Sequence, residues 1–251
     1  SWKINAMLNR RHTLSRLLAL AGLPLAGCAT REGAPTGASA PAGASCGVMN
    51  AQTQKDLSPD EALRRLKEGH ERFVAGRGVN CDLMAQVKET GKGQYPFAAI
   101  VGCIDSRVPP ELVFDQRIGD IFTARVAGNF VNTDILGSLE FATAAAGARL
   151  ICVLGHSECG AIKGAIDDVK LGNLTSLLAN IRPSLSRVRY SGVPSSKDKA
   201  LVQALAEQNA KDAAAAIMSR SPVIAKLVGE GKVKIVTAMH DVTTGRIVWP
   251  G

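Results

Sequence analysis

The chain has 251 residues, of which 46% are hydrophobic and only 4% aromatic, and its formal net charge is +8. This length suffices for one or two domains with a core of small aliphatic side chains. Four of the cations lie before Cys28 with no acidic residue among them, so the rest of the chain carries only +4, without a block of Lys or Arg. That pattern argues against a nucleic-acid-binding protein, and we expect no nucleic-acid partner.

Residues 1–28 predict an export signal. A basic stretch containing Arg10, Arg11 and Arg16 precedes the apolar run Leu17–Ala26. Ten apolar residues are too few to span a bilayer core, which favours an export signal over a transmembrane helix. The run ends in Leu25-Ala26-Gly27-Cys28, which resembles the processing site of bacterial lipoproteins. We therefore expect a periplasmic protein anchored to a membrane by a lipid on Cys28; an N-terminal amphipathic helix is the alternative.

Residues 29–56 are expected to form a flexible tether, because 29–44 consist largely of Ala, Gly, Pro, Ser and Thr. A single folded domain is then expected over 57–251. Cys46 and Cys81 belong to none of the motifs described below. They could pair in an oxidising compartment, but free thiols fit the sequence equally well.

The folded region is expected to begin with a helix at Ser58-Pro59-Asp60-Glu61, which combines a capping serine, a proline at the first helical position and an acidic residue three positions after the cap. Gly76 would end this helix. Strands are expected at 97–102, 121–126, 149–154, 232–239 and 246–249, and further helices at 134–146, 159–166, 173–189 and 200–229, the last broken near Ser221-Pro222. Alternating strands and helices predict an α/β fold with a central, mostly parallel sheet flanked by helices.

Two short motifs follow two of the expected strands. Cys103-Ile104-Asp105-Ser106-Arg107 comes after 97–102, and His156-Ser157-Glu158-Cys159-Gly160 comes after 149–154. Open α/β sheets build their sites at the carboxyl ends of neighbouring strands. Two Cys and one His supply three zinc ligands and leave a fourth position free, which is typical of a catalytic zinc site.

The spacing within the motifs gives each residue an expected part. Cys159 would lie in the first turn of a helix, where the helix dipole favours a thiolate, and Gly160 would leave the approach to the metal uncrowded. Asp105 and Arg107 are close enough to pair, which would keep the carboxylate ionised and able to accept a proton from metal-bound water. Cys152, in the middle of a strand, is interpreted as a buried apolar residue. His240 is interpreted as a strand-end histidine with its hydrogen bonds satisfied, with a proton relay as the alternative.

These motifs, together with Gly93-Gln94-Tyr95-Pro96 and the turn Asp241–Gly245, resemble those of β-class carbonic anhydrases from about Ser58 onward. The resemblance implies Zn²⁺ held by Cys103, His156 and Cys159, with Asp105 and Arg107 as the pair that orients the nucleophile. It also implies a homodimer or a dimer of dimers. Gln94 and Phe122 match positions that line the substrate pocket across a dimer interface. Ala127 stands where plant-type members carry a larger aliphatic residue, and Gly160 borders the same pocket.

The implied activity is that of a lyase, carbonate dehydratase, which hydrates carbon dioxide reversibly to bicarbonate and a proton. One alternative keeps the zinc and the scaffold but hydrolyses carbon disulfide or carbonyl sulfide. Another is a non-catalytic, zinc-stabilised envelope module. In that case Asp105 would be the fourth metal ligand, as it is in the closed state of some members of the family.

Overall fold

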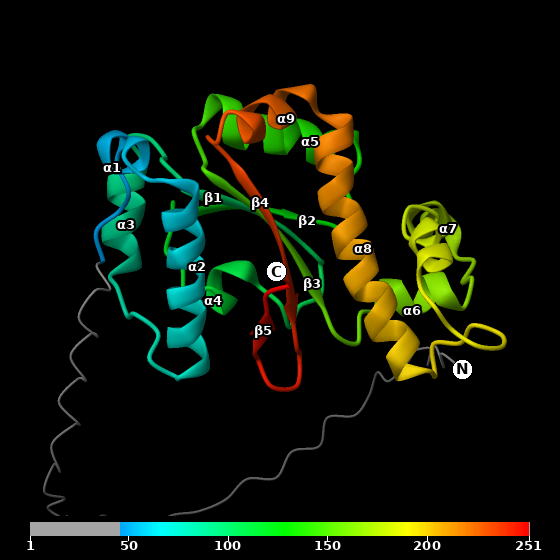
Figure 1. Cartoon of the computed structure of the whole chain (residues 1–251). Helices are drawn as coiled ribbons and strands as arrows, with labels where there is room; N and C mark the ends of the chain where they lie inside the picture. The colour runs from blue at the N-terminus through cyan, green and yellow to red at the C-terminus, as the bar shows by residue number, and fades with distance from the viewer. Residues whose placement is uncertain (1–45, 251) are drawn as a thin grey trace, which may run out of the picture. The chain divides into compact units, whose positions relative to one another are not determined.

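A computed structural model describes residues 46–250 of the chain. Their centre is a five-stranded sheet in the order β2-β1-β3-β4-β5, in which β1 to β4 are parallel and β5 is antiparallel (Figure 1). The strands are β1 (Ala98–Gly102), β2 (Ile121–Arg125), β3 (Leu150–His156), β4 (Lys234–His240) and β5 (Ile247–Val248). The predicted α/β fold with a mostly parallel sheet is therefore confirmed.

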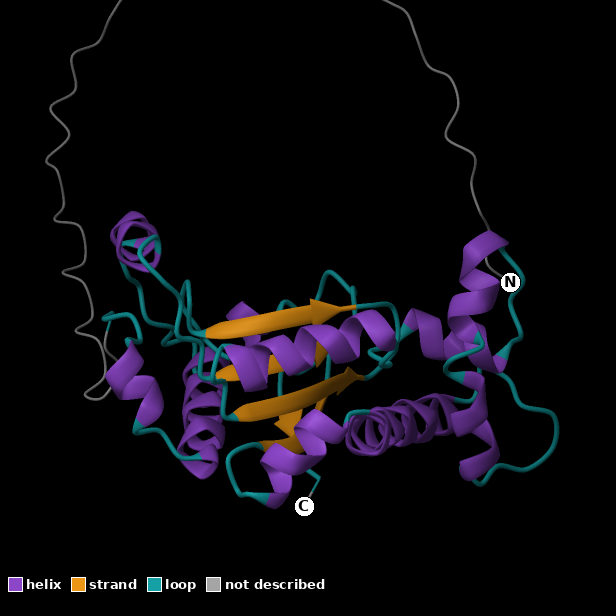
Figure 2. Cartoon of the chain, turned by 90° about the horizontal axis from the view of Figure 1, so that it is seen from above, coloured by secondary structure: helices purple, strands orange, loops and turns teal. Residues whose placement is uncertain are grey.

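Helices cover both faces of the sheet (Figure 2). They are α1 (Ala51–Lys55), α2 (Pro59–Val74), α3 (Leu83–Thr90), α4 (Pro110–Val113), α5 (Thr133–Glu140), the π-helix η1 (Phe141–Ala145), α6 (Gly160–Ile166), α7 (Gly172–Leu178), the 3₁₀ helix η2 (Arg182–Arg187), α8 (Lys199–Arg220) and α9 (Pro222–Gly229). Side chains from α5 to α9 form one core with the sheet, and those from α2 and α4 form a second core on the opposite face. Because β1 and β3 lie between these two cores, every residue in both strands is buried.

Local signals set several of the element boundaries. Ser58 caps α2, its side chain accepting a hydrogen bond from the backbone N–H of Glu61 at 3.1 Å. The chain leaves α2 through Gly76, whose φ of +64° is readily available only to glycine. The predicted break between α8 and α9 is also confirmed, with Ser221 accepting from the N–H of Ile224 at the start of α9.

Two expected helices differ from the structure. The element expected at 134–146 is α-helical only to Glu140 and continues as the π-helix η1. The helix expected at 173–189 is instead α7 followed by η2. Pro183 lies at the start of η2 and has no N–H to donate to a continuing α-helix.

The expected tether boundary at residue 56 lies too late, because 46–56 belong to the fold. Asn50 caps α1, and the side chain of Gln54 is buried and donates to the carbonyl oxygens of Pro96 and Ala146, both at 2.8 Å. Cys46 forms a disulfide with Cys81, which decides the question that the sequence left open. No helix within residues 46–250 is long and apolar enough to cross a membrane. The predicted export signal and Cys28 lie outside the described residues.

Candidate metal and catalytic site

The two sequence motifs meet at the carboxyl end of the parallel sheet. Cys103 follows β1, His156 is the last residue of β3, and Cys159 caps α6. Since β1 and β3 are parallel neighbours, the segments that follow them emerge side by side. The ligand atoms of the three residues all lie within 4.8 Å of one another, and all three side chains are buried. The structure therefore brings together the three expected metal ligands.

The backbone between His156 and Cys159 turns sharply. Glu158 adopts φ +56°, in the left-handed region, and its carboxylate pairs with Lys163 of α6. Cys159 was expected in the first turn of α6, but it lies one position earlier, as the capping residue. Its thiol lies 4.0 Å from that of Cys103. The hydrogen bond between them lowers the pKa of Cys103 and raises the pKa of Cys159, so Cys103 is the more readily ionised of the two thiols.

His156 is oriented as a metal ligand. Its Nδ1 lies 2.9 Å from the carbonyl oxygen of Ser157 and can donate a hydrogen bond to it, which leaves Nε2 as the atom with the free lone pair. The ring is fully buried, and Nε2 has no hydrogen-bond partner among the residues that the structure describes. A buried lone pair beside two sulfurs fits a soft divalent cation such as zinc.

Asp105 and Arg107 form the expected pair beside these ligands. Arg107 donates from its backbone N–H and from Nε to Oδ1, at 3.0 and 2.9 Å, and from Nη2 to Oδ2 at 2.7 Å. These hydrogen bonds lower the pKa of Asp105 to about 2, so its carboxylate is ionised at neutral pH. Oδ2 lies 3.9 Å from Nε2 of His156, which places the carboxylate next to the candidate metal position.

Two further side chains that sequence reasoning missed hold the loops of the site. Arg125, at the end of β2, donates to the carbonyl oxygens of Cys103 at 2.8 Å and of Asp105 at 2.7 Å. Asn209 of α8 donates to the carbonyl oxygen of Gly128 at 2.7 Å, and the N–H of Gly128 donates to Sγ of Cys103 at 3.3 Å. Arg125 was detectable in principle, because it ends a strand beside the one that leads to Cys103. Nothing local in the sequence distinguished Asn209.

The expected pocket residues are spread more widely. Gly160 is exposed, and a Cβ added there would have no atom within 4 Å, so the approach at this position is open as expected. Ala127 is half-buried on the loop that follows β2. Phe122 is half-buried near the amino end of β2, and Gln94 is exposed on the loop before β1. Both lie toward the amino end of the sheet, so one chain alone does not bring them to the metal ligands.

His240 ends β4 directly opposite His156 in the sheet register. It is buried, and neither ring nitrogen has a hydrogen-bond partner in the described part of the chain. The interpretation of His240 as a satisfied histidine is therefore wrong. Burial lowers its pKa to about 4, and the charges of His70 and His156 act in the same direction, so the ring is neutral at pH 7. Cys152 is fully buried, as expected, and burial raises the pKa of its thiol.

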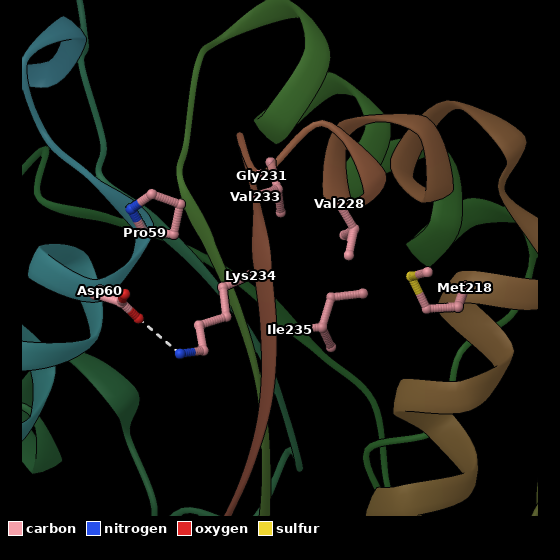
Figure 3. Close-up of a pocket in the computed structure, with 8 residues that line it drawn as sticks. All are labelled: Pro59, Asp60, Met218, Val228, Gly231, Val233, Lys234 and Ile235. Atoms are coloured by element: carbon pink, nitrogen blue, oxygen red, sulfur yellow. Dashed lines mark hydrogen bonds and ion pairs between the residues drawn. The ribbon is translucent and has the colours of Figure 1, made fainter.

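A hollow lies near the amino end of β4, away from the metal ligands. It has a volume of about 460 Å³ and is bordered by an ion pair between Lys234 and Asp60 at 2.6 Å (Figure 3). Lys234 begins β4, whereas the metal ligands lie near its other end. The remaining side chains that line this hollow are mostly apolar, and it contains none of the expected site residues.

Comparison with known proteins agrees with this geometry. Residues 98–247 match the family model described as carbonic anhydrase. Carbonic anhydrase 2 of Mycobacterium tuberculosis is 35% identical over 195 residues, which cover 77% of this chain and 93% of that protein. The chain belongs to the carbonic anhydrase family. A carbonic anhydrase of Mycolicibacterium smegmatis is 32% identical over 196 residues, covering 76% of this chain and 92% of the relative.

Solved structures place the chain in the β class of this family. A β-carbonic anhydrase of Sordaria macrospora, described as tetrameric, superposes with a TM-score of 0.57 at 26% identity and covers 65% of this chain and 85% of its own. The β-carbonic anhydrase of Coccomyxa superposes with a TM-score of 0.59 over 77% of this chain and 86% of its own. Its 20% identity supports the fold alone. The Cys103–His156–Cys159 group is typical of the metal site of this class.

Proposed function

We propose that Cys103, His156 and Cys159 hold a zinc ion and that the protein hydrates carbon dioxide reversibly to bicarbonate and a proton. The observation that carries the proposal is the group of three ligand atoms within 4.8 Å, in a chain of the carbonic anhydrase family. The donor set fits zinc, because two thiols and one imidazole nitrogen, which has no other partner among the described residues, leave one coordination position for substrate chemistry.

Zinc, when bound, supplies a nucleophilic oxygen at neutral pH by lowering the pKa of water. The chain contributes position and charge. Asp105, ionised and held by Arg107, presents a carboxylate oxygen that can accept a hydrogen bond from the nucleophile and so fix its lone pair toward the substrate. Gly160, with open space around it, leaves room for carbon dioxide to approach.

The geometry of the pair favours an open coordination position over a closed one. Both carboxylate oxygens of Asp105 accept hydrogen bonds from Arg107, and these bonds hold the carboxylate in its orientation against a move onto the metal. This arrangement supports the catalytic reading over a non-catalytic zinc-stabilised module. Nothing in this arrangement specifically favours carbon disulfide or carbonyl sulfide over carbon dioxide as the substrate.

The substrate pocket is proposed to be completed by a second copy of the chain. Gln94 and Phe122 lie toward the amino end of the sheet in their own chain, so both would act from a partner subunit. Phe122 also lines an apolar hollow of about 690 Å³, where its ring packs edge-on to the half-exposed Phe141. A paired chain would cover this surface. The relative described as tetrameric supports a homodimer or a dimer of dimers.

Export to the periplasm with a lipid on Cys28 is proposed from the leader sequence. The disulfide between Cys46 and Cys81 supports an oxidising compartment, because reducing cytosols keep most protein thiols free. The segment between Cys28 and Cys46 would connect the lipid to the domain.

The decisive experiment measures carbon dioxide hydration by stopped flow with the purified, zinc-loaded chain. Zinc-dependent hydration that is lost with the metal and returns on its readdition is expected. Carbon disulfide and carbonyl sulfide are offered in parallel. Hydrolysis of either sulfur compound without carbon dioxide hydration would overturn the proposed substrate, and a zinc-loaded chain inactive on all three would favour the non-catalytic module.

A further inference from the structure

We propose that Asn209 is a positioning residue for the metal ligand Cys103 and that it acts through the backbone of Gly128. Asn209 lies in α8, more than 100 positions after Cys103, and no sequence motif joins them. The inference rests on the proposed zinc site and adds to it a residue that touches neither metal nor substrate.

The link is a turn beside the site. The N–H of Asn129 donates to the carbonyl oxygen of Val126 at 2.9 Å and closes the turn 126–129. Gly128 adopts φ +81° at the third position, the backbone angle that a type II turn requires there. A Cβ on Gly128 would also lie 2.4 Å from Cδ1 of Ile181, so the position excludes any other residue without rearrangement. The turn thereby directs the N–H of Gly128 at Sγ of Cys103.

Asn209 fixes the other side of the same glycine. Its side chain is buried, with 2% exposed, and its Nδ2 donates to the carbonyl oxygen of Gly128 at 2.7 Å. Without this donor the carbonyl oxygen would be buried and unpaired, which is unfavourable enough to displace a turn. Because the N–H and the C=O belong to one residue, a displacement that pairs the oxygen again would move the N–H away from the sulfur.

An N–H donor to a thiolate matters for a metal site in two ways. It holds the sulfur in the position from which it reaches the metal, and it draws electron density away from the sulfur. Residues that orient metal ligands in this way typically change metal affinity about 10- to 100-fold when removed. Loss of Asn209 should therefore weaken metal binding and alter the electronic state of the Cys103 thiolate while the three ligands stay in place.

The test compares Asn209→Ala with Ile217→Ala in the full chain. Ile217 is a suitable control because it is fully buried on the same face of α8, two turns further along, about 12 Å away. Zinc affinity is measured by competition with a chromophoric chelator, and the thiolate-to-metal charge-transfer band is recorded after substitution with Co²⁺. Asn209→Ala should bind zinc about 10- to 100-fold more weakly and shift the band to longer wavelength. Ile217→Ala should lose stability but keep both properties.

Three outcomes separate the hypotheses. If the unmodified chain binds no zinc, the proposed function itself fails. If it binds zinc but Asn209→Ala has the wild-type affinity and band, only the role of Asn209 is overturned. Equal loss of zinc in Ile217→Ala would also overturn that role, because general destabilisation would then explain the effect.

A measurement on the unmodified chain covers the case in which Asn209→Ala does not fold. With ¹¹³Cd²⁺ as the bound metal, an N–H···S hydrogen bond transmits a scalar coupling from the metal to the amide proton. A coupling between ¹¹³Cd and the amide proton of Gly128 is expected. Its absence in a cadmium-loaded chain would contradict the proposal, since the geometry through which Asn209 acts would then not exist around the bound metal.

Discussion

Arg107 contacts both carboxylate oxygens of Asp105, with Nε 2.9 Å from Oδ1 and Nη2 2.7 Å from Oδ2. The same carboxylate has Oδ2 only 3.9 Å from Nε2 of the candidate ligand His156. The carboxylate therefore lies beside the candidate metal position. In the proposed site, Arg107 would decide between two uses of this carboxylate, as a hydrogen-bond acceptor for the nucleophile or as a fourth ligand that blocks the site.

Removal of either member of this pair should lower carbon dioxide hydration by about 100-fold or more. Arg107→Ala frees the carboxylate to reach the metal, whereas Asp105→Asn leaves the position open but removes the charged acceptor. The double variant should lose little more than the worse single variant, because residues that act as one unit are not additive. Stopped-flow rates are compared after zinc content is shown to be intact. Additive losses, or near-normal rates in Asp105→Asn, would exclude the pair from the mechanism.

The three free cysteines within residues 46–250, Cys103, Cys152 and Cys159, should differ in their effect on metal content. Cys159→Ala removes a candidate ligand and should abolish stoichiometric zinc, measured by elemental analysis of the purified chain. Cys152→Ala is the matched control, because this equally buried thiol lies in the middle of β3 with no metal-ligand group around it. It should cost some stability and keep about one zinc per chain. Full zinc in Cys159→Ala would contradict the ligand set.

The stability of the folded chain at acidic pH should depend on His240. Its pKa is about 4 in the folded chain, against about 6.5 for an unperturbed histidine, so between these values the unfolded state binds more protons. The free energy of unfolding should therefore fall as the pH drops from 6.5 toward 4, by at most about 1.4 kcal/mol per pH unit from this residue. The stabilising contribution of Asp105 changes only below about 3.8, because its pKa is lowered to about 2. It does not account for the slope in this window.

His240→Leu tests this assignment. The variant removes a buried ring whose two nitrogens are unpaired within residues 46–250, and it should reduce the pH dependence between 4 and 6.5. Urea unfolding of the wild type and the variant at pH 5 and pH 7 gives the comparison. The lowered pKa of His70 changes the free energy of unfolding in the same direction. His70 is present in both proteins, so the difference between them isolates His240. An identical pH dependence in the two proteins would show that His240 has an ordinary pKa or is accessible to water.

The disulfide should contribute measurably to stability. Cys46 and Cys81 are 35 positions apart, and cross-linking a loop of this length stabilises a folded chain by about 4 kcal/mol in the chain-entropy model. Reduction with a phosphine should lower the midpoint of urea unfolding. The Cys46→Ser/Cys81→Ser double variant should start at that lower midpoint and not respond to the reductant. An unchanged midpoint on reduction would mean that the bridge adds nothing to the folded state.

Cell fractionation tests the proposed lipid anchor at Cys28. In a bacterial host that processes lipoproteins, the wild-type chain should be recovered with membranes, and Cys28→Ser should shift it to a soluble or unprocessed fraction. Immunoblots of the fractions provide the measurement, with Cys152→Ala as a cysteine control that should remain with the membranes. Equal recovery of wild type and Cys28→Ser in membranes would exclude acylation at Cys28.

The predictions from the sequence were most complete where the functional residues lie close together along the chain. Cys103, Asp105 and Arg107 lie within five positions, and His156 and Cys159 within four, each set after an apolar strand. Parallel neighbouring strands bring such sets together without further information, and the structure has them together. The α/β fold and the break at Ser221 followed from similarly local patterns.

The parts that could not be predicted depend on contacts between distant positions. Asn209 is an ordinary polar residue in a helix until the fold places it against Gly128. Gln54 lies in a segment whose sequence is typical of the end of a tether, and its hydrogen bonds to Pro96 and Ala146 help to fix α1 to the domain. His240 has no hydrogen-bond partner within residues 46–250 because of the way β4 and its neighbours pack, and the periodicity of a strand does not predict such packing.

The 4.0 Å separation of the Cys103 and Cys159 sulfurs has a consequence for how the enzyme matures. Two thiols this near can form a disulfide with each other under the same oxidising conditions that join Cys46 to Cys81. Such a bond would remove two of the three metal ligands in a single step. The proposed zinc would bind both sulfurs and so protect them, and in an oxidising compartment the order of events would then decide the outcome. A chain that acquires its metal before it meets the oxidant would become active enzyme, and one that meets the oxidant first would need a reductant to recover.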